Sequence, residues 1–188
     1  MPYNLNVKGH MYKEELQLIE KLASTKGPNS TIVEVGTFCG RSAIAWALSS
    51  DPSTNVLCFD PFWEHLDFEG EPCNTWEEFQ ENTKDIKNIR ACRGLVDKDI
   101  WYTEPNKIDI FFIDATHENP VDWDIIYYFL PFIKSGGIVA GHDYTPYGSG
   151  KTANSIAWPD VNFNVHRLEE MFDQKAKTYL AMWHLIKP

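Results

Sequence analysis

Two glycines and an acid follow two neighbouring apolar runs of the chain. Gly36 and Gly40 stand in a turn before an amphipathic stretch, where glycine lets the backbone turn tightly and lets a ligand approach. The amides of such a turn point at the ligand from a helix N-terminus, which favours a carboxylate or a phosphate. Asp60 ends the next apolar run and is placed to accept both hydroxyls of a ribose. Together these residues indicate a site for an adenosine-bearing ligand, unless the glycines only form the turn and Asp60 only caps the segment before Pro61.

A second group of polar residues follows two later apolar runs. Asp114 ends one run, His117 lies shortly after it, and His142 and Asp143 follow the next run. Neighbouring parallel strands lie about 4.8 Å apart, so these side chains can meet around one ion or one substrate hydroxyl. Carboxylates here suit Mg²⁺, and a histidine here can accept a hydroxyl proton. In a metal-free alternative, His142 alone is the base and the aspartates orient it and the ligand. For His117, capping of the next helix is an alternative to a direct chemical role, and the other histidines, His10 among them, are expected to be surface or packing residues.

Short β-rich apolar runs alternate with longer amphipathic stretches along the chain. This alternation predicts an α/β fold with a mostly parallel central sheet and helices on both faces. In such a sheet the ligand binds beyond the carboxyl ends of the strands, where both polar groups stand. The predicted strands span 31–35, 56–59, 89–93, 108–113, 138–140 and 178–186, and the predicted helices span 12–22, 42–48, 75–87, 121–133 and 161–172.

The connecting segments carry signals of their own. The stretch 62–73 is expected to be irregular, with Thr75 capping the next helix and Glu78 completing a capping box. Gly136 and Gly137 are expected to stop the fourth helix. The segment 144–159 is long and rich in glycine and proline, as is typical of a functional lid. Only one strand is expected after the last helix, which would leave the sheet edge open or covered by a second copy in a homodimer.

Composition excludes several classes of protein. The chain has 188 residues, of which 43% are hydrophobic and 23% charged, and neither repeat nor linker is visible, so we expect one domain over 1–188. A formal net charge of −10 disfavours binding to nucleic acid or to an anionic membrane. The four cysteines stand far apart with no C-x-x-C spacing, which is typical of reduced thiols rather than a zinc cage or a disulfide framework. With no signal pattern and no long apolar run, we expect a cytoplasmic protein.

Two sequence runs resemble a known family. The run EVGTFCGRSAIAWA resembles motif I of class I S-adenosylmethionine-dependent methyltransferases, and is especially similar to the glycine loop of catechol O-methyltransferase-type enzymes. The run IDATHENPVDWDIIYYFLPFIKSGGIVAGHDY resembles small-molecule O-methyltransferases of the macrocin O-methyltransferase type. The resemblance spans about 14–186. It implies a single-domain Rossmann-like methyltransferase fold, with a cofactor half at about 30–100 and a catalytic and acceptor half at about 105–188.

The resemblance implies a site for S-adenosylmethionine at the turn from Gly36 to Gly40, which we call the glycine turn. Its residues would be Glu34 near the amino end of the methionine part, Gly36 and Gly40 along that part, Ser42 near its carboxylate, Phe38 by the sulfonium and Asp60 at the ribose. The chain departs from the family after the third predicted strand, where Leu95 and Val96 replace a more usual polar residue. The contact to adenine is therefore not carried over, and Trp63 is a candidate for stacking on the ring.

The resemblance also implies a reaction. The expected activity is methyl transfer to a small-molecule acceptor, at a hydroxyl oxygen, with His142, Asp143 and His117 as catalytic residues. In the catechol-type relatives, acids at the positions of Asp114 and Asp143 hold Mg²⁺, so a magnesium site and a metal-free site both stay open. In the metal-free alternative, Asp114 helps to orient the cofactor. The segments 61–76 and 144–158 are expected to form the acceptor pocket. The alternatives are a catalytically inactive S-adenosylmethionine-binding module and, since the turn lacks G-x-G-x-x-G spacing, less favourably a dinucleotide-dependent oxidoreductase.

Overall fold

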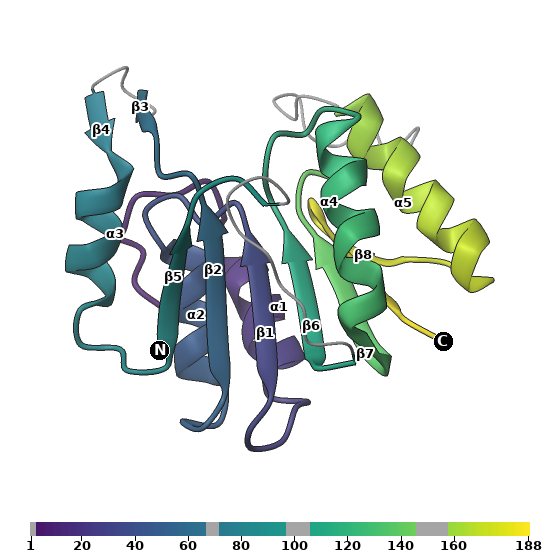
Figure 1. The fold of residues 1–188 in the computed structure, drawn as a ribbon, viewed down its shortest axis with the longest axis horizontal. Helices are drawn as coiled ribbons and strands as arrows, with labels where there is room; N and C mark the ends of the chain where they lie inside the picture. Colours follow the sequence, from purple (N-terminus) through teal and green to yellow (C-terminus); the bar gives the residue numbers. More distant parts are fainter. Residues whose placement is uncertain (1–2, 67–71, 97–105, 146–157) are drawn as a thin grey trace.

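The strands of the central sheet run in the order β5-β2-β1-β6-β7-β9-β8 (Figure 1). A computed structural model describes residues 3–66, 72–96, 106–145 and 158–188. Its seven-stranded sheet consists of β1 (Thr31–Val35), β2 (Asn55–Asp60), β5 (Ile89–Arg93), β6 (Ile108–Ile113), β7 (Ile133–Gly141), β8 (Lys177–Tyr179) and β9 (Met182–Ile186). The pairs from β5 to β7 are parallel, and β9 is antiparallel to both β7 and β8. The strand order reverses between β1 and β6, which is where ligands bind in open α/β sheets.

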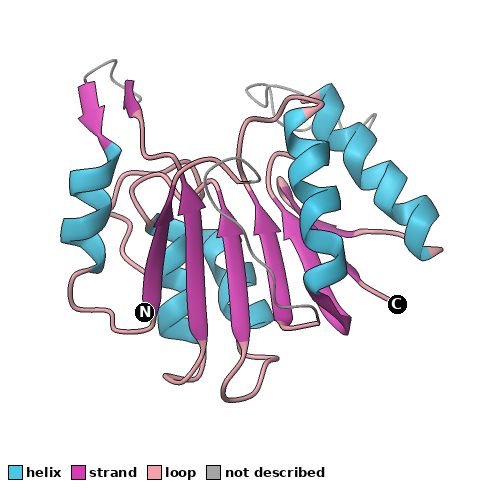
Figure 2. Cartoon of the chain, viewed as in Figure 1, coloured by secondary structure: helices cyan, strands magenta, loops and turns pink. Residues whose placement is uncertain are grey.

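Helices cover both faces of this sheet (Figure 2). The helices α1 (Lys13–Ala23) and α2 (Arg41–Ser49) lie on one face, and α4 (Val121–Phe129) and α5 (Pro159–Phe172) lie on the other. Successive residues of β6 enter opposite cores: Phe112 contacts Trp46 on the α2 side, with ring centroids 5.5 Å apart, and Phe111 contacts Phe129 on the α4 side at 5.0 Å. This two-sided burial explains why the β6 sequence is a nearly continuous apolar run. The predicted α/β architecture is confirmed.

The fourth helix ends earlier than predicted. After α4, residues Leu130–Phe132 form a 3₁₀ turn, and β7 already begins at Ile133. Pro131 explains the early end, because proline has no amide hydrogen to continue the helix. Gly136 and Gly137, expected to stop the helix, lie inside β7, where Gly136 has φ +76° and the two glycines exchange backbone hydrogen bonds with Lys187.

The third helix is capped by a different residue than predicted. In α3 (Thr75–Thr83) the side chain of Asn74 is the cap and accepts the amide of Glu77 at 3.2 Å. The hydroxyl of Thr75 instead donates to the carbonyl of Trp63, so the predicted capping box at Thr75 is wrong. The helix stops at Thr83 rather than near 87. The segment before it, expected to be irregular, contains a short antiparallel pair, β3 (Glu64–Leu66) and β4 (Pro72–Asn74).

The C-terminal segment forms two strands where one was predicted. In β8 and β9, Tyr179 pairs with Met182 across a turn in which Leu180 has φ +52°. The turn contains neither glycine nor proline, so its sequence carried no signal of a hairpin. This hairpin pairs with β7 through β9 and makes β8 the last strand of the sheet. Most of the expected lid, residues 146–157, lies outside the described residues. No helix within the described ranges has the length and apolar character needed to cross a membrane.

Candidate active site

The turn after β1 packs directly against the loop after β6. Gly36 has φ +87°, and a Cβ at this position would lie 1.9 Å from the carbonyl oxygen of Asp114. Gly40 has φ +91° and is the residue that precedes α2. Only glycine combines a left-handed backbone with the absence of a side chain. The structure therefore requires glycine at position 36 because of the close approach of the two loops.

A buried carboxylate without a partner stands at the foot of this turn. Glu34 is fully buried in β1, and neither of its carboxylate oxygens has a hydrogen-bond partner among the described residues. The hydroxyl of Thr37, also buried, lacks one as well. Burial raises the pKa of Glu34 to about 8, an effect that the neighbouring hydroxyls of Ser42 and Thr37 partly offset. Since unpaired buried carboxylates are costly, this group is suited to a cation supplied by a ligand.

Asp60 braces the glycine turn from the end of β2. Its Oδ2 accepts the amides of Thr37 and Phe38 at 2.8 and 2.9 Å, and its Oδ1 accepts the amide of Phe62 at 2.6 Å. The interpretation of Asp60 as a mere cap before Pro61 therefore accounts for only part of its contacts. A carboxylate offers about four acceptor positions, so about one is left for a ligand hydroxyl.

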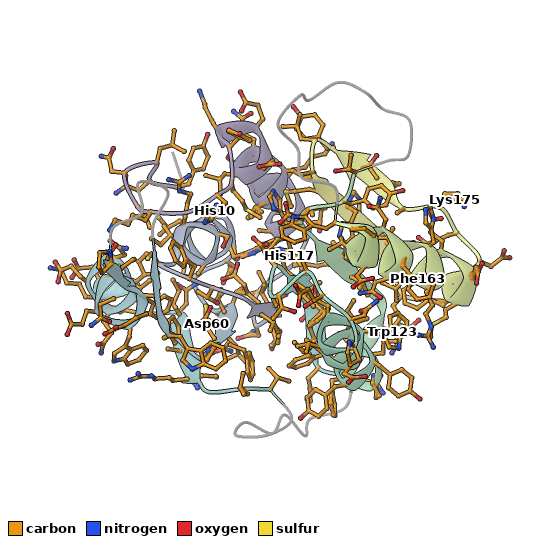
Figure 3. All side chains as sticks on the ribbon, turned by 90° about the horizontal axis from the view of Figure 1, so that it is seen from above. His10, Asp60, His117, Trp123, Phe163 and Lys175 are labelled. Atoms are coloured by element: carbon orange, nitrogen blue, oxygen red, sulfur yellow. The ribbon has the colours of Figure 1, made fainter. Side chains whose placement is uncertain are left out.

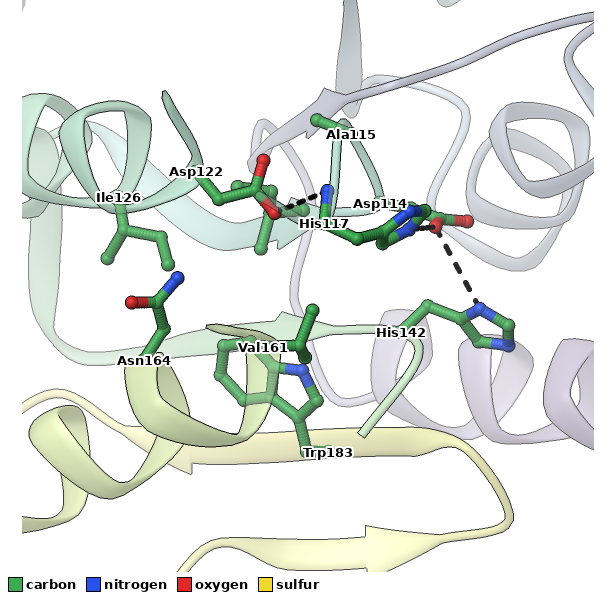
Figure 4. A pocket seen from close by; sticks show the side chains of 10 residues that line it. Asp114, Ala115, His117, Asp122, Ile126, His142, Val161, Asn164 and Trp183 are labelled. Carbon is green, nitrogen blue, oxygen red and sulfur yellow. Dashed lines mark hydrogen bonds and ion pairs between the residues drawn. The ribbon is translucent and has the colours of Figure 1, made fainter. Parts of the chain in front are cut away.

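The structure brings Asp114, His117, His142 and Asp143 together at the carboxyl ends of β6 and β7, and Figure 4 shows the first three of them. Nε2 of His117 lies 3.2 Å from Oδ1 of Asp114 and 2.9 Å from Oδ2 of Asp143. Nδ1 of His142 lies 3.0 Å from the same oxygen of Asp143 and 3.8 Å from Oδ1 of Asp114. We call these four residues the His–Asp cluster. The two imidazole rings thus lie between two carboxylates, and Oδ2 of Asp143 contacts both rings.

Opposite charges stabilise each other within the His–Asp cluster. Burial alone would lower the pKa of His117, but Asp114 and Asp143 raise it to about 10. Burial would likewise lower the pKa of His142, but Asp114, Asp143 and Glu15 raise it to about 11. Burial would raise the pKa of Asp143, yet hydrogen bonds from the two imidazoles hold it well below its usual range. These contacts favour the charged forms of His117, His142 and Asp143.

Glu15 in α1 is a site residue that the sequence did not reveal. Its side chain is 1% exposed, and its Oε1 lies 3.1 Å from Nε2 of His142, close but without the alignment of a hydrogen bond. The amides of Tyr12 and Ala181 donate to the two oxygens of the same carboxylate. Both ring nitrogens of His142 consequently face carboxylates. In sequence, Glu15 looks like an ordinary acid in the first turn of a helix.

The segment before α1 also reaches the site. The guanidinium of Arg41, the first residue of α2, donates to the carbonyls of Val7, Met11 and Leu5 at 2.7, 2.8 and 3.2 Å. This holds His10 beside Phe38, with ring centroids 5.8 Å apart. Seen from the carboxyl edge in Figure 3, His10 and His117 both lie toward the middle of the molecule. His10 is exposed and packs against Phe38, as expected of a surface or packing residue.

Three predicted site residues have a left-handed backbone without being glycine. They are Phe38 at φ +52°, His117 at φ +64° and Asp143 at φ +59°. Such conformations cost about 1–3 kcal/mol each and persist where the surroundings enforce them. For His117 the enforcing group is Asp122, whose carboxylate accepts the amides of His117 and Thr116 at 2.9 and 3.1 Å. At His117 these contacts fix the backbone that carries the imidazole.

The donor atoms of Asp114, His117 and Asp143 lie within 4.8 Å of one another. Mg²⁺ requires a nearly octahedral shell of oxygens. Here an imidazole nitrogen lies within hydrogen-bond distance of both carboxylates, in the space that such an ion would need. The residues therefore do not fit Mg²⁺ in this arrangement, although the two carboxylates do converge as predicted.

The cavity beneath the cluster is small. It has a volume of about 10 Å³, and Asn164 and Trp183 line it together with His117 and His142 (Figure 4). The indole nitrogen of Trp183 is buried and has no hydrogen-bond partner among the described residues. This volume is close to the least that holds one water molecule, so the cavity is too small for an organic ligand.

The family model described as "Methyltransferase domain" matches residues 33–144, more than half of the chain. This match contains both the glycine turn and the His–Asp cluster. The chain belongs to this family of methyltransferase domains. The methyltransferase domain is also 30% identical, over 147 residues, to the uncharacterized protein R132 of Acanthamoeba polyphaga mimivirus. That match covers 76% of this chain and 64% of the viral protein, so the chain spans less than two thirds of the length of this curated relative.

Solved structures share the fold of this methyltransferase domain. The O-methyltransferase TomG from Streptomyces achromogenes, involved in tomaymycin synthesis and solved with S-adenosylmethionine, is 18% identical with a TM-score of 0.65, covering 95% of this chain and 82% of that one. An O-methyltransferase from Bacillus cereus, solved with S-adenosylhomocysteine, is 17% identical with a TM-score of 0.64, covering 97% and 85%. At these identities the likeness establishes the Rossmann-like methyltransferase fold.

Proposed function

We propose that this methyltransferase domain transfers the methyl group of S-adenosylmethionine to a hydroxyl oxygen of a small molecule. The observation that supports this most is the direct contact, at Gly36 and Asp114, between the glycine turn and the loop after β6, which carries Asp114 and His117 of the His–Asp cluster. A ligand at the turn would present its reactive part to the cluster. The solved relatives named above are O-methyltransferases, one with S-adenosylmethionine and one with S-adenosylhomocysteine.

The glycine turn offers groups that match the parts of the cofactor. The unpartnered carboxylate of Glu34 would receive the ammonium group, and Ser42, at the start of α2, would lie near the carboxylate. Phe38 would pack near the sulfonium, and Asp60 would use its remaining acceptor position for one ribose hydroxyl. When bound, S-adenosylmethionine supplies a methyl group on a positively charged sulfur, which an oxygen lone pair can attack.

Within the His–Asp cluster, Asp143 is the residue that we expect to take the hydroxyl proton. Its side chain is 26% exposed, whereas that of His142 is 6% exposed and has both nitrogens directed at carboxylates. This assignment differs from the expectation that His142 alone is the base. The oxygen that has gained a methyl group is strongly acidic, so a weakly basic carboxylate suffices. His117 and His142 hold Asp143 in place through its Oδ2.

Magnesium has no role in this proposal, because the mixed donor set does not fit it. We therefore expect the affinity for S-adenosylhomocysteine and the rate of methyl transfer to be unchanged by added Mg²⁺.

Cofactor binding is expected to depend on pH through Glu34. Its pKa is about 8 in the folded protein, raised from 4.5. The folded protein therefore holds a proton on Glu34 that the unfolded chain loses, and the free energy of unfolding falls as the pH rises from about 4.5 to about 8. A bound ammonium group favours the ionised carboxylate, so binding releases a proton in this window. The affinity for S-adenosylhomocysteine should therefore rise toward pH 8, by up to about tenfold per pH unit. Calorimetric titrations at pH 6, 7 and 8 measure this rise. In Glu34→Gln the slope should vanish, and an unchanged slope would contradict the role of Glu34.

Asp60→Asn is expected to weaken the binding of S-adenosylhomocysteine by roughly 10- to 100-fold, since the amides of Thr37 and Phe38 lose a charged acceptor worth about 1.5–3 kcal/mol. Asp109→Asn is a matched control, because Asp109 also accepts a backbone amide, that of Thr31 at 2.9 Å, but at the opposite end of the sheet. The control should lower the melting temperature and leave the affinity unchanged. Equal affinities for both variants would refute the role of Asp60.

The proposed function is tested first by calorimetric titration with S-adenosylhomocysteine, and then by transfer of a labelled methyl group from S-adenosylmethionine to a panel of hydroxylated small molecules. We expect stoichiometric, micromolar binding and transfer to oxygen. Binding without transfer to any acceptor would favour the inactive S-adenosylmethionine-binding module. Absence of binding would overturn the proposal, and titration with dinucleotides would then test the oxidoreductase alternative.

A further inference from the structure

Three metal-ligating side chains meet beside the glycine turn and outside the His–Asp cluster. Cys39 lies in the turn, Cys73 in β4 and Glu78 in the first turn of α3. The two sulfur atoms are 3.5 Å apart, and Sγ of Cys73 lies 3.3 Å from Oε1 of Glu78. Both cysteines are buried, at 0% and 1% exposure, and both are free thiols. Three segments that are distant in sequence thus converge on one point.

The distances between these atoms approach those of a tetrahedral metal site. Zinc binds thiolate sulfur at about 2.3 Å and carboxylate oxygen at about 2.0 Å, which places two sulfurs about 3.8 Å apart and a sulfur and an oxygen about 3.5 Å apart. The observed separations of 3.5 and 3.3 Å are slightly shorter. A disulfide, by contrast, needs the sulfurs about 2.05 Å apart. The two sulfur atoms would therefore move less to bind an ion than to form a disulfide.

The charges around the three donors also balance for a divalent ion. Nζ of Lys8 lies 2.8 Å from Oε1 of Glu78. Two thiolates, one carboxylate, one divalent ion and one ammonium group sum to zero. Without an ion, burial raises the pKa of the Cys39 thiol far above its usual range and also raises the pKa of Cys73, so both thiols keep their protons and can bond to each other and to Glu78. An ion would displace both protons, as thiol ligands require.

We infer that Cys39, Cys73 and Glu78 form a binding site for a thiophilic divalent cation such as Zn²⁺. The side chain of Glu78 is 33% exposed, which leaves room for a water molecule as the fourth ligand. The ion would connect the glycine turn to β4 and α3. The side-chain amide of Asn82 in α3 already donates a hydrogen bond to the Cys39 carbonyl at 2.9 Å. This site is independent of the proposed reaction, because it needs neither the cofactor nor an acceptor.

The test is titration of the reduced protein with Co²⁺, which reports thiolate ligation by an intense near-ultraviolet charge-transfer absorption and a tetrahedral site by its visible bands. We expect one ion per chain, with Zn²⁺ displacing Co²⁺. Cys39→Ser and Cys73→Ser should each weaken binding by roughly 100-fold or more, beyond the 10- to 100-fold that is typical of outer-shell changes. Cys92→Ser, a thiol in β5 outside the group of three, should leave the titration unchanged.

Glu78→Gln keeps both thiols and serves if the serine variants do not fold. It should weaken Co²⁺ binding at least about tenfold. Asp143→Asn tests whether the His–Asp cluster contributes to this signal. Because a thiolate-to-metal charge-transfer band requires a cysteine ligand, this variant should leave the band unchanged. The inference is overturned if the unsubstituted protein gives no charge-transfer band, or if the band survives in Cys39→Ser and Cys73→Ser. Failure of S-adenosylhomocysteine to bind would instead overturn the proposed function alone.

Discussion

Gly36→Ala is expected to abolish binding of S-adenosylhomocysteine and to lower the melting temperature by about 10 °C or more. The added Cβ would lie 1.9 Å from the carbonyl oxygen of Asp114, so the glycine turn and the loop after β6 would have to separate. The left-handed backbone adds about 1–2 kcal/mol of its own. We expect a total loss of about 4 kcal/mol, at the upper end of single substitutions, and 1 kcal/mol corresponds to about 2–4 °C at this chain length. Calorimetry measures both effects.

Two other glycines separate the causes of this loss. Gly136 has φ +76°, but a Cβ added there would meet no atom within 4 Å, so Gly136→Ala should cost only the backbone contribution of about 1–2 kcal/mol. Gly27 lacks both the positive φ and any such neighbour, so Gly27→Ala should be nearly neutral. If Gly36→Ala and Gly136→Ala lowered the free energy of unfolding by similar amounts, the contact of position 36 with Asp114 would not contribute to the loss.

Asp143→Asn is expected to lower the rate of methyl transfer by roughly 100-fold or more, in line with the loss of a general base. The affinity for S-adenosylhomocysteine should stay within about twofold, because Asp143 contacts His117 and His142 rather than the glycine turn. His142→Ala should act in the same direction, since it removes a group that holds Asp143. The rate is measured with an acceptor found in the panel of hydroxylated molecules, and the affinity by calorimetry.

Asp173→Asn is a matched control for this variant. Asp173 also has a left-handed backbone, at φ +49°, but it lies exposed at the end of α5. The control should leave both the rate and the affinity unchanged. If Asp143→Asn instead weakened S-adenosylhomocysteine binding as much as it slowed methyl transfer, Asp143 would belong to the cofactor half of the site.

The parts of the fold that could be predicted are those whose signals are local. The strands β1 and β6 are short runs of mostly apolar residues, and the predicted bounds 31–35 and 108–113 match them. The glycine turn was recognisable because a positive φ and a close approach both demand glycine. The position of the His–Asp cluster followed from a general rule, since the ends of neighbouring parallel strands lie side by side.

The features that the sequence did not predict are of two kinds. Some depend on contacts between residues that are distant in the chain, and one depends on which of two adjacent residues caps a helix. Asn74 and Thr75 are both suitable helix caps, and only the contact of Thr75 with Trp63 decides between them. Cys39 and Cys73 lack any motif spacing, because different elements bring them together. Glu15 has no neighbour in sequence that points to His142. Such pairings arise from tertiary packing and leave no periodic trace in one sequence.

The contacts of Glu15 have a consequence for when the site is assembled. Its carboxylate joins α1 to the amide of Ala181, which is 166 residues away in the chain, and to His142. Contacts between such distant residues form late, because the cost of closing the intervening loop comes before the gain. During synthesis the N-terminal part emerges first. The contacts of the glycine turn with Asp60 and Asp114 span fewer residues, so we expect the surroundings of His142 to be completed after the glycine turn.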